Sequence, residues 1–114
     1  MHVKSLESAQ PYEAPNHFDV KALRLQGFEE GGPRNFWVGL SHILPGGGAG
    51  PDASPLEKVY VVLAGRIRVS AEGEDRVLQT FDSVCIGPNV ERTLTNPGNE
   101  VATILVVMPY PPKK

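Results

Sequence analysis

The chain has 114 residues, a formal net charge of −2 and an isoelectric point near 5.9. This length suits one hydrophobic core, so we expect a single domain. The longest basic run is the pair of lysines at the C-terminus, so the chain lacks the basic patches of nucleic-acid-binding proteins and no nucleic-acid partner is expected.

The cysteine content and the N-terminal residues predict a location. Cys85 is the single cysteine, which rules out an intramolecular disulfide and fits a reducing compartment. We expect it to act as a small apolar filler. Residues 1–7 carry no apolar signal-peptide core, and no stretch reaches the length of a membrane span. A soluble cytoplasmic protein without membrane contact is therefore expected.

The chain begins with an expected arm and one strand. Residues 1–18 show little periodicity and contain two prolines, so we expect an arm that packs against the barrel or a second subunit. Its histidines, His2 and His17, are expected to be exposed or capping residues. Residues 19–26 alternate apolar and polar side chains, which predicts a half-buried strand, and the glycine-rich segment 27–34 predicts a surface loop. The domain itself is assigned to residues 19–114.

Residues 35–44 are apolar on both alternating faces, as expected for a strand between a pocket and a packed layer. If the face of the even-numbered residues looks inward, His42 lines the pocket. The alternative is a core histidine that is satisfied by a backbone carbonyl.

A polar, turn-forming segment, residues 52–57, runs into an apolar strand that stops at Gly65. Lys58, Tyr60 and Val62 share one face of this strand. An inward Lys58 would need Asp52, a tyrosine oxygen, water or a ligand nearby, because a buried unpaired ammonium is costly. The alternative is a salt bridge at the rim with Asp52 or Glu57 and no ligand.

The rest of the chain predicts further short strands. Residues 66–70 and 76–80 form a charged hairpin with outward arginines, residues 83–86 and 92–96 form two strands, and residues 101–108 form a central strand buried on both faces. Asn89 stands in a turn and tolerates positive φ. About eight strands or more with no substantial helix predict an all-β jelly-roll barrel, although periodicity alone would equally allow a β-sandwich.

Two motifs carry a resemblance to a known family. The first joins Pro45-Gly46-Gly47 to the segment 52–65, and the second runs from Asp82 to Asn96. In this frame the chain resembles the cupin family over roughly residues 36–109. The resemblance implies a jelly-roll β-barrel with an internal pocket. Phe81 occupies a position where the family usually has glycine, so that turn should differ locally.

The resemblance also indicates where a cupin would hold its metal. The family's ligands are three histidines plus a carboxylate or a fourth histidine, and these positions fall on Asp52, Ser54, Lys58 and Arg92. The alternative spacing would place the first pair on Pro51 and Ala53, which is no better for a metal. One carboxylate and one hydroxyl cannot hold a divalent ion against two fixed cations, so no metal and no other cofactor is expected.

The same four positions instead favour an anionic small molecule as the partner. Lys58 and Arg92 would bind a carboxylate or stabilise enolate charge, with Ser54 as a further binding group at the rim. Asp52, His42 or Tyr60 would move a proton in an isomerisation, lyase or decarboxylation step. Three alternatives stay open: a non-catalytic binding or accessory module, a metal-dependent enzyme with atypical ligands, and nucleophilic catalysis by Cys85. For Arg92, the alternative to a pocket role is a surface arginine paired with Glu91 or Glu100.

A homodimer is expected for two reasons. The outward apolar face of residues 59–63 needs a partner surface, and so does the arm formed by residues 1–18. The family resemblance implies the same assembly.

Overall fold

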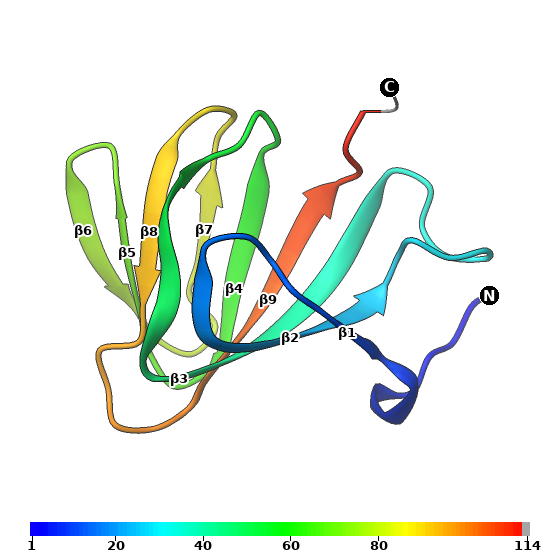
Figure 1. Cartoon of the computed structure of the whole chain (residues 1–114), viewed down its shortest axis with the longest axis horizontal. Helices are drawn as coiled ribbons and strands as arrows, with labels where there is room; N and C mark the ends of the chain where they lie inside the picture. Colours follow the sequence, from blue (N-terminus) through cyan, green and yellow to red (C-terminus); the bar gives the residue numbers. More distant parts are fainter. Residues whose placement is uncertain (113–114) are drawn as a thin grey trace.

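The computed structural model describes residues 1–112 and shows an all-β, nearly closed antiparallel barrel (Figure 1). In this part of the chain the strands are β1 (Gln10–Tyr12), β2 (His17–Gln26), β3 (Phe36–Ala53), β4 (Lys58–Ala64), β5 (Ile67–Ala71), β6 (Glu74–Leu78), β7 (Ser83–Ile86), β8 (Glu91–Thr95) and β9 (Ala102–Pro109). A short 3₁₀ helix, η1 (Leu6–Ser8), precedes them. Within residues 1–112, no helix has the length and apolar character needed to cross a membrane. The prediction of an all-β fold without substantial helix is confirmed.

A bend in β3 folds the sheet over itself. The strand order is β6-β5-β8-β3-β9-β4-β7, and β2 also pairs with β3. The first half of β3, residues 36–43, pairs with β9, whereas residues 48–53 pair with β8. Between them Gly46 adopts a φ of 82°, and a Cβ on Gly48 would collide with the carbonyl oxygen of Leu94. Glycine at these two positions therefore allows β3 to leave one layer and join the other.

Alternation along the strands sets the interior. Lys58, Tyr60 and Val62 on β4 are buried, while Val59 and Val61 face outward, as the sequence predicted. The outward arginines of the β5–β6 hairpin are confirmed as well. β9 is central, between β3 and β4, but its outward side chains are only half-buried.

Two expectations about side-chain orientation are wrong. On β3 the odd-numbered residues Trp37, Ser41 and Ile43 face the interior, so the even-numbered face carrying His42 looks outward. Both faces of this strand are apolar, and periodicity therefore had little power to choose between them. Cys85 is exposed on β7 and does not fill the core.

The N-terminal arm packs on its own barrel. β1 pairs with β2, with Gln10 opposite Arg24 and Tyr12 opposite Ala22. β2 begins at His17, two residues before the expected start of the strand. The arm therefore already has a partner surface within its own chain, and it gives no reason of its own to expect a second subunit.

Two turns use positive φ without glycine. Asn89 adopts a φ of 63°, as its turn position predicted. Phe81 adopts a φ of 69° and is 80% exposed. The turn was expected to differ locally from that of the family, and here a phenylalanine takes the left-handed backbone conformation. Such a conformation is strained for an aromatic residue.

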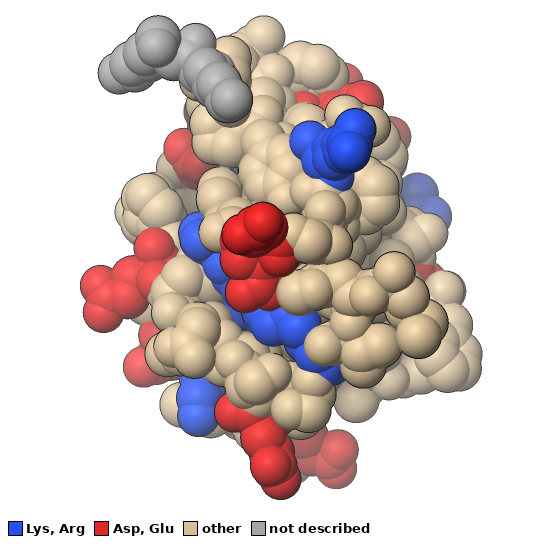
Figure 2. Space-filling view, turned by 90° about the vertical axis from the view of Figure 1, so that its right-hand side faces the viewer, with Lys and Arg blue, Asp and Glu red and all other residues tan. Residues whose placement is uncertain are grey.

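Charged residues of both signs mix on the face shown in Figure 2. A band of lysine and arginine side chains lies in a furrow across the centre of this face, with acidic side chains beside it. The positive charge on this face is local, and it does not form the broad basic surface that nucleic acid requires.

The outer face of the β3–β9–β4 layer still predicts a homodimer. Val59 and Val61 lie opposite Val107 and Leu105, and Val59 keeps 37% exposure. We expect Val59→Asp to shift the protein from dimer to monomer in sedimentation velocity at micromolar concentration, because a carboxylate would interrupt a buried apolar patch. Val77→Asp is the matched control, since Val77 is an equally exposed valine (42%) on the β6 hairpin. A wild-type protein that sediments at 12.3 kDa would contradict the dimer.

Candidate functional site

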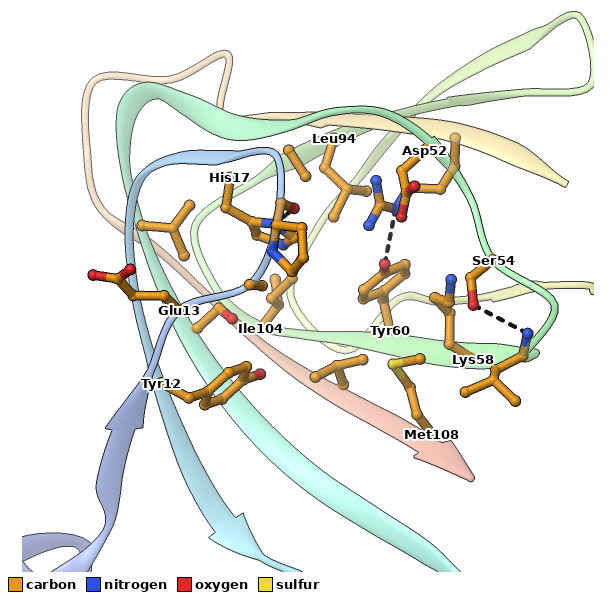
Figure 3. Close-up of a pocket in the computed structure, with 18 of the residues that line it drawn as sticks. Tyr12, Glu13, His17, Asp52, Ser54, Lys58, Tyr60, Leu94, Ile104 and Met108 are labelled. Atoms are coloured by element: carbon orange, nitrogen blue, oxygen red, sulfur yellow. Dashed lines mark hydrogen bonds between the residues drawn. The ribbon is translucent and has the colours of Figure 1, made fainter. Parts of the chain in front are cut away.

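A cavity of about 280 Å³ lies inside the barrel between the two layers (Figure 3). This volume corresponds to roughly nine water molecules, which suits a small metabolite. The side walls are apolar and include Leu94, Ile104, Val106 and Met108. Polar side chains converge at one end, where β4, β8 and the end of β3 meet. An apolar chamber with a few convergent polar groups is typical of small-molecule sites.

Lys58 extends from β4 into this cavity, beside Tyr60 (Figure 3). Lys58 keeps only 4% exposure, yet within residues 1–112 its ammonium has no hydrogen-bond or ion-pair partner. Burial and the like charge of Arg92 lower the pKa of Lys58, and the carboxylate of Asp52 opposes this shift. The cavity therefore contains a desolvated amine that is available to a ligand.

Arg92 enters from β8 and is held in place by two hydrogen bonds. Its Nε donates to the hydroxyl of Tyr60 at 3.0 Å, and its Nη1 donates to the carbonyl of Gly50 at 3.1 Å. Nη2 has no hydrogen-bond partner within residues 1–112, and it remains accessible from the cavity. The guanidinium is thus oriented in advance and keeps donors for an anion.

Tyr60 lines the cavity with its phenol. Burial raises the pKa of its phenol, although the charge of Arg92 and the hydrogen bond from it pull that pKa down. The phenol therefore stays protonated at neutral pH. Because its oxygen accepts from Arg92, its own hydrogen is free to be donated to a ligand.

Asp52 and Ser54 form the rim of the same end. Asp52 is exposed and lies opposite Arg92 in the β3–β8 register, but no ion pair joins the two side chains. The hydroxyl oxygen of Ser54 accepts the backbone N–H of Leu56 at 3.1 Å, which fixes the turn into β4 (Figure 3). Both residues line the cavity.

The structure thus brings together five of the six residues named from the sequence. His42 is the exception, because it lies on the outer face of β3, where its Nδ1 is 3.2 Å from the hydroxyl of Thr103. It does not line the cavity. We therefore give His42 no role in this site.

His17 lines the cavity and was assigned no role from the sequence. Its Nδ1 lies 2.8 Å from the carbonyl of Pro15, and since a carbonyl only accepts, Nδ1 carries the proton. Burial is the main reason that the pKa of His17 is lowered; Arg92 lowers it further, while the Pro15 hydrogen bond and Asp52 oppose the shift. The ring is therefore neutral at physiological pH, with Nε2 as a free acceptor. The sequence signal that could have found His17 is the alternating pattern of β2, which can be extended back to residue 17.

A third cation, Arg24, lines the opposite end of the cavity. Its guanidinium carbon lies 3.8 Å from the ring centre of Phe28, 4.7 Å from Tyr12 and 5.6 Å from Trp37. Its Nε is buried and has no hydrogen-bond partner among the described residues 1–112. Cation–π contacts take the place of an ion pair here. The sequence alone does not predict that these aromatic residues surround Arg24, because they come from three separate segments.

The donor set does not fit the metal of the fold family. Residues 1–112 contain no group of three or more His, Cys, Asp or Glu side chains placed to hold an ion. The four positions that the family uses present a carboxylate, a hydroxyl and two cations. Lysine and arginine repel a divalent ion, so these residues do not form a metal site.

We expect the purified protein to carry no stoichiometric transition metal. The measurement is elemental analysis of protein purified without chelator. Close to one equivalent of iron, manganese, nickel or zinc that survives dialysis against a chelator would contradict this expectation.

Comparison with known proteins finds a relative by sequence and several similar structures. The chain is 40% identical over 111 residues to the Beta-D-galactosidase Rv1717 of Mycobacterium tuberculosis, covering 97% of this chain and 96% of the relative. A predicted oxalate decarboxylase from Thermotoga maritima superposes with a TM-score of 0.80 at 19% identity, covering 97% of this chain and 100% of that one. The polyketide cyclase RemF from Streptomyces resistomycificus also gives 0.80, at 18% identity, covering 96% and 79%.

The fold and the cavity define a small antiparallel β-barrel built around an internal cavity. The sequence profile of the cupin domain matches residues 39–108, and the chain belongs to the cupin family. The family resemblance seen in the two sequence motifs is therefore confirmed.

Proposed function

We propose that this cupin binds a small carboxylate-bearing metabolite without a metal and moves a proton on it, in an isomerisation, lyase or decarboxylation step. The observation that carries the proposal is Lys58, a residue of only 4% exposure whose ammonium faces the cavity and has no hydrogen-bond or ion-pair partner within residues 1–112. Such a group is destabilising in the empty protein. A ligand that brings the missing negative charge accounts for its presence.

The alternative of a non-catalytic module with a self-filled interior is less favoured. That alternative requires Lys58 and Arg92 to be bonded to carboxylates in a closed interior. Within residues 1–112, the ion pairs join other residues, and neither cation takes part in one. The cavity also keeps a volume of about 280 Å³. Both observations favour an external anion.

Each polar group has a proposed task. Lys58 and the Nη2 of Arg92 hold the carboxylate and stabilise charge that develops next to it. The hydroxyl of Tyr60 donates a proton, and its orientation is fixed by the Arg92 Nε–H. The neutral Nε2 of His17 or the carboxylate of Asp52 accepts a proton on the side of the rim.

Hydrolysis of a β-D-galactoside is the second candidate, and the relative of 40% identity favours it. Glycoside hydrolysis usually needs two carboxyl groups flanking the bond to be cleaved. The acidic residues that line the cavity are Asp52 and Glu13. Figure 3 shows Glu13 at the far side from Asp52, with its carboxylate pointing away from the cavity. The geometry therefore supports this reaction less well than the anion site.

A thermal-shift screen tests the proposal against this alternative. Small mono- and dicarboxylic acids are each compared with the corresponding neutral amide. The acids should raise the unfolding midpoint, and the amides should not. A galactoside with a chromogenic leaving group is assayed in parallel. Stabilisation by neutral galactosides or their turnover, without any response to acids, would replace the proposed function with the second candidate.

A further inference from the structure

We propose that Lys58 forms an imine with the carbonyl group of a small oxo acid whose carboxylate is held by Arg92. This inference rests on the proposed function, since it assumes the carboxylate site, and it narrows the ligand to molecules that carry a carboxylate and a ketone or aldehyde. It assigns Lys58 a covalent task beyond charge neutralisation.

The surroundings of Lys58 are those of a nucleophilic amine. A lysine becomes nucleophilic when it is desolvated in an apolar pocket or placed beside another cation. Lys58 meets both conditions, with 4% exposure and Arg92 in the same cavity. Its amine is free of hydrogen bonds and ion pairs to residues 1–112, so no protein contact has to break before it attacks.

The spacing suits one small molecule. Lys58 and Tyr60 share the inward face of β4, so their Cα atoms are about 7 Å apart. Arg92 is bonded to Tyr60 at 3.0 Å, which places its guanidinium next to the tip of that ring. A carboxylate held at Arg92 lies in the same cavity as the amine of Lys58, so the adjoining carbonyl carbon can face that amine.

The chemistry balances without any further reagent. The neutral amine adds to the carbonyl carbon, forming a C–N bond and opening the C=O double bond. The former carbonyl oxygen then leaves as water, taking both hydrogens that the amine nitrogen loses. The hydroxyl of Tyr60 is placed to relay one of these two protons, because its own oxygen already accepts from Arg92: it protonates the departing oxygen and takes a proton back from the nitrogen.

Reductive trapping tests the imine. The wild-type protein is incubated with pyruvate or with acetoacetate in the presence of cyanoborohydride and analysed by intact mass and peptide mapping. We expect one reduced adduct, located on Lys58, with at least one of these acids. Lys58→Met should lose at least 90% of this trapping, whereas Lys21→Met, which removes an exposed lysine on β2, should keep it.

Two outcomes overturn the proposal. No adduct at all, or an adduct spread evenly over the lysines, would both mean that Lys58 has no special reactivity. The same samples without reductant are followed by thermal shift. Stabilisation by the oxo acid without an adduct would remove the imine and leave the carboxylate site standing. If neither acid stabilises or is trapped, the imine proposal falls, and the wider acid-against-amide screen decides the carboxylate site separately.

Discussion

Arg92→Met should weaken carboxylate binding by about 30-fold or more while leaving the protein folded. Loss of one partner in a buried, charged hydrogen bond costs on the order of 2 to 5 kcal/mol of binding free energy. The methionine keeps the apolar stem of the side chain but removes the free Nη2 donor. The measurement is calorimetric titration of the variant with the acid that binds best to the wild type.

The apo form of this variant should also lose some stability. Arg92 donates to Tyr60 and to the carbonyl of Gly50, and these acceptors lose their partner. About 1–3 kcal/mol is expected for such a loss, which a domain of this size tolerates. Arg92→Lys serves as a second variant that keeps the charge without the planar fork, and it should bind more weakly than wild type. Wild-type affinity in both variants, or failure of both to fold, would place Arg92 in the architecture.

Lys58→Met should stabilise the empty protein while it removes binding. Lys58 is only 4% exposed and its ammonium has no protein partner within residues 1–112, whereas methionine fills similar space without a charge. The free energy of unfolding is expected to rise by about 1–2 kcal/mol when a residue that serves function is replaced in this way. This gain corresponds to an unfolding midpoint roughly 5 °C higher in calorimetry. Lys21→Met, at an exposed position on β2, should change the midpoint little.

The stabilisation should depend on pH in a defined direction. The pKa of Lys58 is lowered in the folded protein from its ordinary value of 10.5. Between these two pKa values the unfolded chain binds a proton that the folded chain does not, so the stability of the wild type rises with pH across this window. Lys58→Met lacks this gain, and its advantage should shrink as the pH approaches 10.5. An advantage that stays constant, or a variant less stable than wild type at neutral pH, would show that Lys58 supports the fold.

Local alternation was sufficient where one face of a strand is polar, as on β5, where Ile67 and Val69 are buried and Arg68 is exposed. On β4 the outward face is apolar, and the motif frame rather than alternation predicted that Lys58 and Tyr60 face inward. On β3 both parities are apolar because one face lines the cavity and the other forms the outer surface of the layer. The alternation along β3 then does not show which face points into the barrel, and His42 was assigned to the wrong face for this reason.

The remaining site residues depend on contacts between distant segments. His17 reaches the cavity because β2 pairs along β3, which places His17 opposite Ala49. The aromatic residues around Arg24 come from β1, from the loop after β2 and from β3. Spacing motifs report on one segment at a time, so they located Lys58 and Arg92 but could not show that either would lack a protein partner.

The most direct test of the anion site is a crystal structure of the protein with the acid that stabilises it most. The carboxylate oxygens should accept a hydrogen bond from the Nη2 of Arg92 inside the cavity between β4 and β8, and the Nζ of Lys58 should donate to the carboxylate or, in an oxo acid, be bonded to the carbonyl carbon. An acid bound elsewhere, or a cavity closed by ion pairs of Lys58 and Arg92 with Asp52, would contradict the account.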